Sequence, residues 1–182
     1  KMKQLSLSGS PRENVGKKGA ALARKEGNVP AVLYGGAEQT VFSISEKDAK
    51  KLVFTPEVYK VDLDIAGKKS KAIVKEVQIH PVSDQILHMD FMEIVDGKPV
   101  KVKLPVRITG SSKGVLLGGK LSQLYRKVNV SGMESDLPDA ITCDITPLGI
   151  GDKIRVADIE VPGVKMLDAA TSVVVAVRSA RG

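Results

Sequence analysis

Residues 75–91 read Lys-Glu-Val-Gln-Ile-His-Pro-Val-Ser-Asp-Gln-Ile-Leu-His-Met-Asp-Phe and predict two short strands joined by a turn. The turn is expected at residues 81–84, where Pro, Ser and Asp favour a tight reversal of the chain. Because side chains alternate between the two faces of a strand, each strand should place a pair of hydrogen-bonding groups on one face. These pairs are Gln78 with His80, and His88 with Asp90. The stretch therefore predicts a polar surface on a sheet.

The composition predicts a globular chain with an aliphatic core. Of 182 residues, 42% are hydrophobic, none is Trp, and Phe and Tyr number three each, so one large domain or two small ones are expected. The single Cys143 excludes an internal disulfide, and its alternation with Ile141 and Ile145 predicts a small core residue. We find no stretch of transmembrane length and no signal-peptide pattern, so a cytoplasmic protein without membrane contact is expected.

Positive charge is concentrated in two blocks of the chain. The net charge is +7. Residues 1–37, including Lys1, hold seven Lys or Arg against two acids, and residues 97–129 hold eight against none. Such an excess favours a polyanionic partner, RNA or DNA before a membrane, although each block could also be an ordinary solvated lysine surface.

The first half of the chain reads mainly as β-strands. Strand patterns lie at residues 5–7, 29–35, 41–45, 58–65 and 71–79. A turn at residues 66–68 should join the last two of these strands. One short helix is expected at residues 19–26, ended by Gly27, and another after the N-cap Ser45. Short, regularly spaced strands favour a small barrel.

The second half also reads as β-rich. A turn at residues 96–99 accompanies a shift in composition, so we expect two domains, residues 1–95 and residues 96–182. The expected elements are an edge-like strand at 100–108, a glycine-rich loop at 110–119, a helix at 120–126, and strands at 127–130, 141–145, 164–167 and 172–177. The fold class is therefore mainly β, a barrel followed by a second β-rich domain.

Each basic block contains a candidate anion-binding surface. Arg12, Lys17 and Lys18 are expected in a polar loop whose glycines let backbone amides approach phosphates. In the second block, Lys101 and Lys103 should share one face of a strand. That spacing fits either an anion-facing surface or protection of a sheet edge against aggregation.

Two arrangements resemble catalytic motifs but lack required groups. Residues 114–121 nearly match the phosphate-binding pattern GxxxxGK[ST], but Leu121 stands where a hydroxyl would hold Mg²⁺. His88 and Asp90 resemble a base with its orienting carboxylate, yet no nucleophile motif and no third metal ligand accompany them. The sequence therefore predicts no enzyme activity, no metal site and no cofactor.

Several motifs resemble those of a known family, the large-subunit ribosomal protein twenty-five, which binds 5S ribosomal RNA. The motifs are Asn28-Val-Pro-Ala-Val-Leu-Tyr34-Gly35, Val77-Gln78-Ile-His80-Pro81-Val and Leu87-His88-Met-Asp90-Phe91. The second half is similar to the extra domain of the long, CTC (general stress protein) type. The motifs that carry this similarity are Leu104-Pro105-Val, Gly118-Gly119-Lys120-Leu, Leu137-Pro138 and Ile150-Gly151-Asp152-Lys-Ile.

The resemblance implies a fold and a ligand. The first domain would be a small antiparallel β-barrel with short helices that docks on an irregular internal loop of 5S RNA through a widened minor groove. The implied RNA-binding residues are Arg12, Lys17, Lys18 and Arg24 at phosphates, Tyr34 near the backbone, and Gln78, His80, His88 and Asp90 on the RNA-facing sheet. In this reading Asp90 accepts from a base amino group, and His88 contacts base or ribose.

The implied role is that of a ribosome-bound structural protein in the central protuberance region of the large subunit. The alternative is a free-standing stress-response RNA-binding protein of the same fold. The second domain could contact ribosomal RNA or a neighbouring protein, and its charge pattern does not choose between them. One departure concerns the first helix, where this chain has Ala20-Ala-Leu-Ala23 and many relatives carry adjacent arginines.

Overall fold

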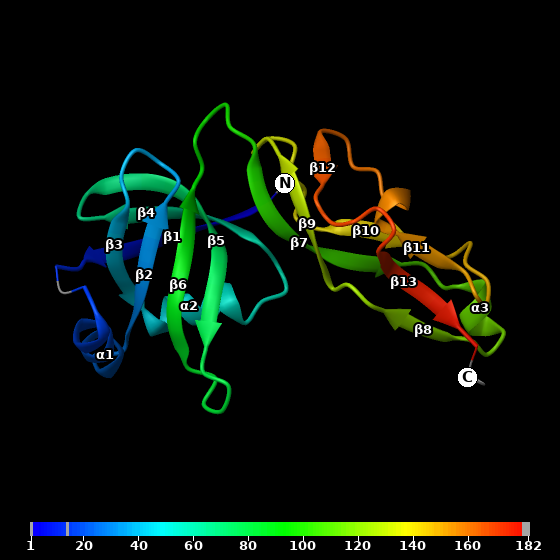
Figure 1. Ribbon diagram of the computed structural model, residues 1–182, viewed down its shortest axis with the longest axis horizontal. Coiled ribbons are helices and arrows are strands. Elements are labelled where there is room, and N and C mark those ends of the chain that lie inside the picture. The colour runs from blue at the N-terminus through cyan, green and yellow to red at the C-terminus, as the bar shows by residue number, and fades with distance from the viewer. Residues whose placement is uncertain (1, 14, 180–182) are drawn as a thin grey trace. The chain divides into compact units, whose positions relative to one another are not determined.

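The computed structural model describes residues 2–13 and 15–179, which form two compact units, residues 2–98 and residues 99–179. Each unit is built mainly of strands (Figure 1), as predicted. Lys1, counted in the first basic block, lies outside the described residues. Among the described residues, no helix is long and apolar enough to span a membrane.

The first unit is a closed barrel of strands in the order β1-β3-β2-β6-β5-β4. The strands are β1 (Lys3–Pro11), β2 (Asn28–Tyr34), β3 (Thr40–Ser45), β4 (Tyr59–Ile65), β5 (Lys68–Ile79) and β6 (Ile86–Glu93). This confirms the predicted barrel and adds one correction. The barrel is not antiparallel throughout, because β1 pairs with β4 and β2 with β6 in parallel.

Aliphatic and aromatic side chains fill the barrel interior. The rings of Phe42 and Phe91 meet at a centroid distance of 5.6 Å, and both residues are fully buried. Helix α2 (Glu46–Val53) begins after Ser45, as predicted, and adds Ala49 and Leu52 to this core. Burying a side chain of this size contributes about 1.5–3 kcal/mol, so the core fixes which face of each strand points outward.

A two-residue turn and a six-residue loop join the strands of two neighbouring hairpins. Between β4 and β5, Ala66 and Gly67 both have positive φ, 52° and 85°, as a two-residue hairpin turn requires. The amide of Gly67 donates to Oδ1 of Asp64 at 2.9 Å. The predicted turn at residues 81–84 joins β5 to β6.

The first helix starts earlier than the sequence suggests. Helix α1 spans Lys17–Lys25, so Lys17 and Lys18 lie in its first turn and not in a loop. Its N-cap is Gly16, whose residue type gives a weaker start signal than Ser, Thr, Asp or Asn. Gly27, with φ of 78°, follows the end of the helix as predicted.

The second unit contains two small sheets, ordered β10-β7-β9-β12 and β11-β13-β8. Its elements are β7 (Val100–Thr109), α3 (Lys113–Leu116), β8 (Lys120–Gln123), β9 (Lys127–Gly132), β10 (Ile141–Asp144), β11 (Lys153–Arg155), η1 (Val156–Asp158), β12 (Val164–Met166) and β13 (Val173–Arg178). Cys143 is buried, as predicted, and burial raises the pKa of its thiol.

Three predictions for the second unit are wrong. Residues 120–126 do not form a helix, because β8 pairs with β13 and this pairing overrides the local pattern. The loop expected at 110–119 contains the short helix α3. Strand β7 is not an edge strand, since β9 pairs along Val100–Pro105 and β10 along Val106–Thr109.

Candidate nucleic-acid interface

The outer face of β6 carries a paired histidine and carboxylate. Met89 and Phe91 point into the barrel core, so His88 and Asp90 lie on the opposite face. Nδ1 of His88 lies 2.8 Å from Oδ1 of Asp90, and the two side chains are 34% and 31% exposed. A carboxylate only accepts hydrogen bonds, so the Nδ1–H donates. Nε2 then remains as the second polar atom of the ring, an acceptor when the ring is neutral and a donor when it is protonated.

The neighbouring strand β5 extends this polar face. Gln78 lies directly opposite His88, and Glu76 lies opposite Asp90. Residues that lie opposite each other in an antiparallel pair share a face, with Cβ atoms about 4.5–5.5 Å apart. Gln78 is therefore placed as predicted for the sheet. Glu76 is absent from the sequence prediction, although it alternates with Gln78 and the same strand pattern could have found it.

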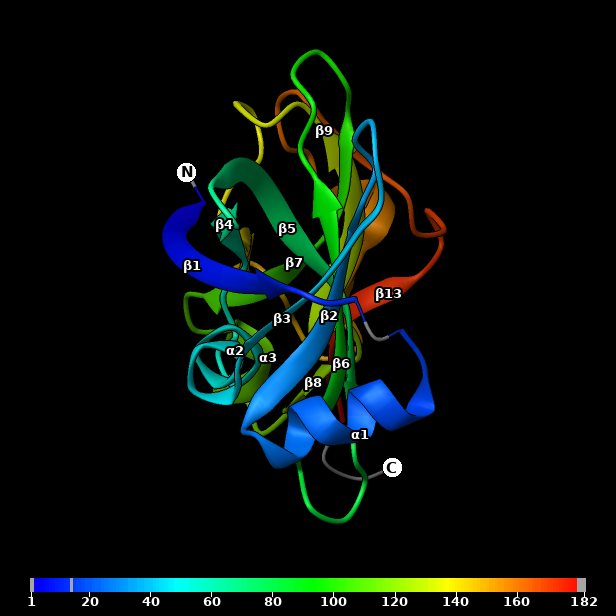
Figure 2. The same ribbon diagram turned by 90° about the vertical axis from the view of Figure 1, so that its left-hand side faces the viewer.

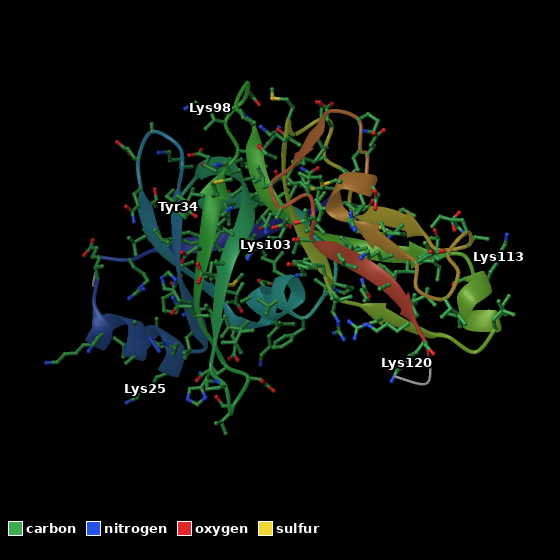
Figure 3. The ribbon with its side chains drawn as sticks, turned by 45° about the vertical axis from the view of Figure 1, so that its right-hand side comes forward. Lys25, Tyr34, Lys98, Lys103, Lys113 and Lys120 are labelled. Carbon is green, nitrogen blue, oxygen red and sulfur yellow. The ribbon has the colours of Figure 1, made fainter. Side chains whose placement is uncertain are left out.

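Tyr34, at the end of β2, belongs to the same region of the barrel. Strand β2 pairs with β6, and Figure 3 labels Tyr34 on this sheet. Burial raises the pKa of the Tyr34 phenol, and the negative charges of Asp90 and Glu76 raise it further. The phenol therefore stays neutral and keeps its proton available for a hydrogen bond.

His80 lies just beyond β5, in the loop that leads to β6. Strand β5 ends at Ile79, so the alternation that places Gln78 does not extend to His80. Nδ1 of His80 instead accepts hydrogen bonds from the amides of Val82 and Ser83, at 3.3 and 3.2 Å. His80 thus stabilises the loop between β5 and β6, and only its Nε2–H remains for an outside partner.

Helix α1 carries four cations, Lys17, Lys18, Arg24 and Lys25. It contacts β2 and buries Ala23, and Figure 2 shows it beside the β2 end of the barrel. Its first turn contains Lys17 and Lys18 and no acid. Because the N-terminal end of a helix carries partial positive charge, two lysines there are unfavourable for the free helix and favourable for a bound anion.

A groove lies beside this first turn of α1. Its lining residues are Glu13, Val15, Gly16, Lys17, Lys18, Gly19 and Leu22.

The two predicted arginines are both half-buried. In the last turn of α1, Nε of Arg24 donates to the carbonyl of Ala20 at 3.1 Å, which holds the guanidinium along the helix. Arg12 follows β1 and is also half-buried, with its amide bonded to the carbonyl of Val41.

The structure thus gathers the predicted residues into two groups. Tyr34, Gln78, His88 and Asp90 lie on neighbouring strands of the barrel, and Lys17, Lys18 and Arg24 lie on the helix that packs against β2. Within the described ranges, no three His, Cys, Asp or Glu side chains come together as a metal site. The arrangement offers hydrogen-bonding groups on a rigid sheet and cations beside it.

Comparisons with known proteins identify both units. Residues 7–91 match the Ribosomal L25p family, and residues 99–181 match the C-terminal domain of ribosomal protein TL5. Large ribosomal subunit protein bL25 of Porphyromonas gingivalis is 42% identical over 186 residues, covering 100% of this chain and 97% of the relative. Large ribosomal subunit protein bL25 of Bacteroides thetaiotaomicron is 40% identical over 189 residues, covering 100% and 96%. The chain therefore belongs to the ribosomal L25 family, in the long form with a TL5-type second domain, and it is a structural protein and not an enzyme, as its sequence predicts.

Proposed function

We propose that this protein is a structural constituent of the large ribosomal subunit and that its first domain, residues 1–95, binds 5S ribosomal RNA. The ribosomal role is supported by full-length relatives that are named large ribosomal subunit proteins. The RNA-binding role is supported by the polar face on β5 and β6 and by the cations of α1. In this proposal residues 96–182 form a second domain with a separate partner.

The His88–Asp90 pair carries the proposal. The 2.8 Å contact fixes the imidazole, so Nε2 of His88 has a defined direction toward a base or ribose. Asp90 accepts from a base amino group, and Gln78 both donates and accepts. A carboxylate near phosphates is unfavourable unless it meets a well-placed donor, so Asp90 contributes specificity more than affinity.

The target must be an irregular segment of RNA. Regular RNA duplexes are read mostly through shape and 2′-hydroxyls, because their deep major groove hides the base edges. An irregular internal loop with a widened minor groove, in the central protuberance region, would expose those edges to the outer face of β5 and β6. The surface of the sheet suits such a groove because its side chains are evenly spaced.

The cations have a different role from the sheet. Arg12, Lys17, Lys18 and Arg24 hold phosphates, which supplies affinity that is blind to sequence and falls with salt. The neutral hydroxyl of Tyr34 lies near the RNA backbone. His80 contributes mainly by holding the loop between β5 and β6, with its Nε2–H as its one remaining contact.

The test is a filter-binding titration of the full chain with intact 5S RNA and with 5S RNA whose irregular loop is replaced by a regular duplex. His88→Ala and Asp90→Ala should each weaken binding to intact RNA by about 1–3 kcal/mol and remove the preference for the loop. Asp62→Ala is the matched control, since Asp62 is a half-buried carboxylate on another strand of the same barrel. Wild-type affinity in both β6 variants would refute the site.

The ribosomal role has its own measurement. Co-sedimentation with the large subunit at a copy number near one per ribosome is expected. A protein found free of ribosomes, yet binding 5S RNA, would instead be a separate stress-response RNA-binding protein. The two experiments therefore separate the ligand from the cellular assembly.

A further inference from the structure

Two consecutive leucines are exposed at the end of α3 in the second unit. Leu116 is 76% exposed and Leu117 is 77% exposed, and Val115 before them is partly exposed. Ile150 is a further exposed aliphatic residue of this unit, at 46%, and its Cγ1 lies 3.1 Å from the position that a Cβ on Gly119, two residues after Leu117, would take. Contiguous aliphatic side chains on a surface mark an interaction site more often than isolated ones.

The turn that carries the leucines is held by a buried serine. Ser112 is 1% exposed, and its Oγ donates to the carbonyl of Leu148 at 2.7 Å. The same Oγ accepts from the amides of Gly114 and Val115, at 3.1 and 3.3 Å. The start of the turn is therefore fixed to a segment more than thirty residues later in the chain.

Close backbone packing also holds the turn in place. A Cβ on Gly114 would lie 2.6 Å from the carbonyl carbon of Gly149, so the two backbones are in contact. Gly118 has a φ of 91°, and the amide of Gly119 donates to the carbonyl of Gly114 at 2.8 Å. The leucines are thus presented by an ordered backbone, which lowers the ordering cost of binding.

Cations lie at the start of α3 and at the start of β8, before and after the leucines in the sequence. Lys120 on β8 lies directly opposite Arg178 on β13, and both are exposed. Like charges in this position destabilise a sheet unless an anion compensates them. Figure 3 shows Lys113 on α3 and Lys120 at the start of β8. The nearby carboxylate of Asp152 already accepts from the amide of Gly149, at 2.7 Å.

We propose that this surface, the leucine tip, docks into a protein partner that offers an apolar pocket bordered by Asp or Glu. The leucine tip consists of Lys113, Val115, Leu116, Leu117, Lys120, Ile150 and Arg178. RNA would satisfy the cations but offers no aliphatic pocket for two leucines. A second copy of this chain would bring two basic borders together, and their repulsion opposes self-association.

The experiment places a photoreactive benzophenone amino acid at Leu117 in the full chain, expressed in growing cells. We expect a crosslink to one protein, at a peptide in which apolar residues adjoin Asp or Glu. The charge-reversal variant K120E/R178E should lower the crosslink yield by at least about tenfold, because it turns attraction into repulsion. L116S, which removes an aliphatic contact and leaves the charges, should also lower it.

The matched control places the same benzophenone at Met133, another exposed apolar residue of the second unit. It is measured in the otherwise native chain and in K165E, which reverses an exposed charge elsewhere in this unit. No crosslink to the same peptide is expected there. A crosslink from Leu117 to RNA or to a second copy, a yield insensitive to K120E/R178E, or no crosslink at all would each overturn the proposal. The crosslink is measured in whole cells and does not require the protein to be on ribosomes. Absence of the protein from ribosomes would therefore refute the ribosomal role but would neither support nor refute docking of the leucine tip.

Discussion

The His88–Asp90 pair of the barrel lies on a strand, whereas Leu116 and Leu117 of the second unit lie at the end of the short helix α3. On β6, His88 and Asp90 are two residues apart because consecutive side chains of a strand point to opposite faces. Leu116 and Leu117 are adjacent, and both are exposed, which a half-buried strand does not allow. A strand therefore suits evenly spaced hydrogen-bonding groups, and a turn suits a compact apolar projection.

The largest expected effect concerns the core beneath the polar strand. Phe91→Ala should lower the free energy of unfolding of the barrel by about 3–5 kcal/mol, because it removes a fully buried ring that packs on Phe42. Amide hydrogen exchange should rise along β5 and β6. Leu104→Ala, in the core of the second unit, is the control and should raise exchange in β7 and β9 instead. Equal protection of β6 in Phe91→Ala and wild type would contradict the dependence of the polar face on this ring.

The support of the turn can be tested with two serines that both precede helices. Ser112→Ala should cost about 0.5–2 kcal/mol, since it removes the side chain that caps α3 and its hydrogen bond to the carbonyl of Leu148. Ser45→Ala should change stability by less than about 0.5 kcal/mol, because the Ser45 side chain makes no capping hydrogen bond. Urea unfolding of both variants measures the difference. Equal costs would show that the leucine tip is held by something other than Ser112.

A smaller effect distinguishes the role of helix α1 in RNA binding from that of strands β5 and β6. Lys17→Ala should reduce the slope of log affinity for 5S RNA against log salt concentration by about one unit. It should also weaken binding to all RNA sequences by the same factor. Lys50→Ala is the control, since Lys50 pairs with Glu46 at 2.9 Å on α2. A loss of loop preference in Lys17→Ala, with the slope unchanged, would reverse the roles proposed for helix and sheet.

The smallest effect is a change in a titration, and it tests whether the polar face is assembled in the free protein. Asp90→Asn should bring the pKa of Tyr34 back toward its ordinary value, since the Asp90 charge raises it. Ultraviolet difference titration against Tyr34→Phe isolates this phenol. Glu76→Gln should act in the same direction and more weakly, and Asp62→Asn should have no effect.

The sign of the accompanying stability change follows from the direction of the shift. The folded state keeps the Tyr34 proton at a pH where the unfolded chain has begun to lose it, near the ordinary pKa of about 10. Stability from this group should therefore fall as pH rises through that value. A Tyr34→Phe variant should lose that part of the alkaline slope.

Much of the barrel could be predicted because its signals are local. Alternation in residues 75–91 located both strands of the hairpin and the outward direction of Gln78, His88 and Asp90. Gly67 and the turn at residues 81–84 marked reversals that the structure contains. The resemblance to the family implied the ligand, 5S RNA, and the roles of single residues, which strand alternation alone does not predict.

The remaining features depend on contacts between distant residues. Leu121 and Leu124 are spaced as on a helix, yet residues 120–123 form a strand because β13 supplies a partner more than fifty residues later. The parallel pairings of the barrel leave no local signal either. His80 follows the last residue of β5, and its ring accepts hydrogen bonds from the loop, contacts that strand alternation does not predict.

The parallel pairing of β1 with β4 has a consequence for synthesis of the chain on a ribosome. Lys3 pairs with Tyr59 and Gly9 with Ile65, so β1 emerges well before that partner exists. Strand β6 then fills the place between β2 and β5, which means that the barrel closes only after Glu93 has left the tunnel. Until then the nascent chain displays open strand edges that can pair with other chains. A product truncated before residue 93 should consequently depend on chaperones to avoid aggregation.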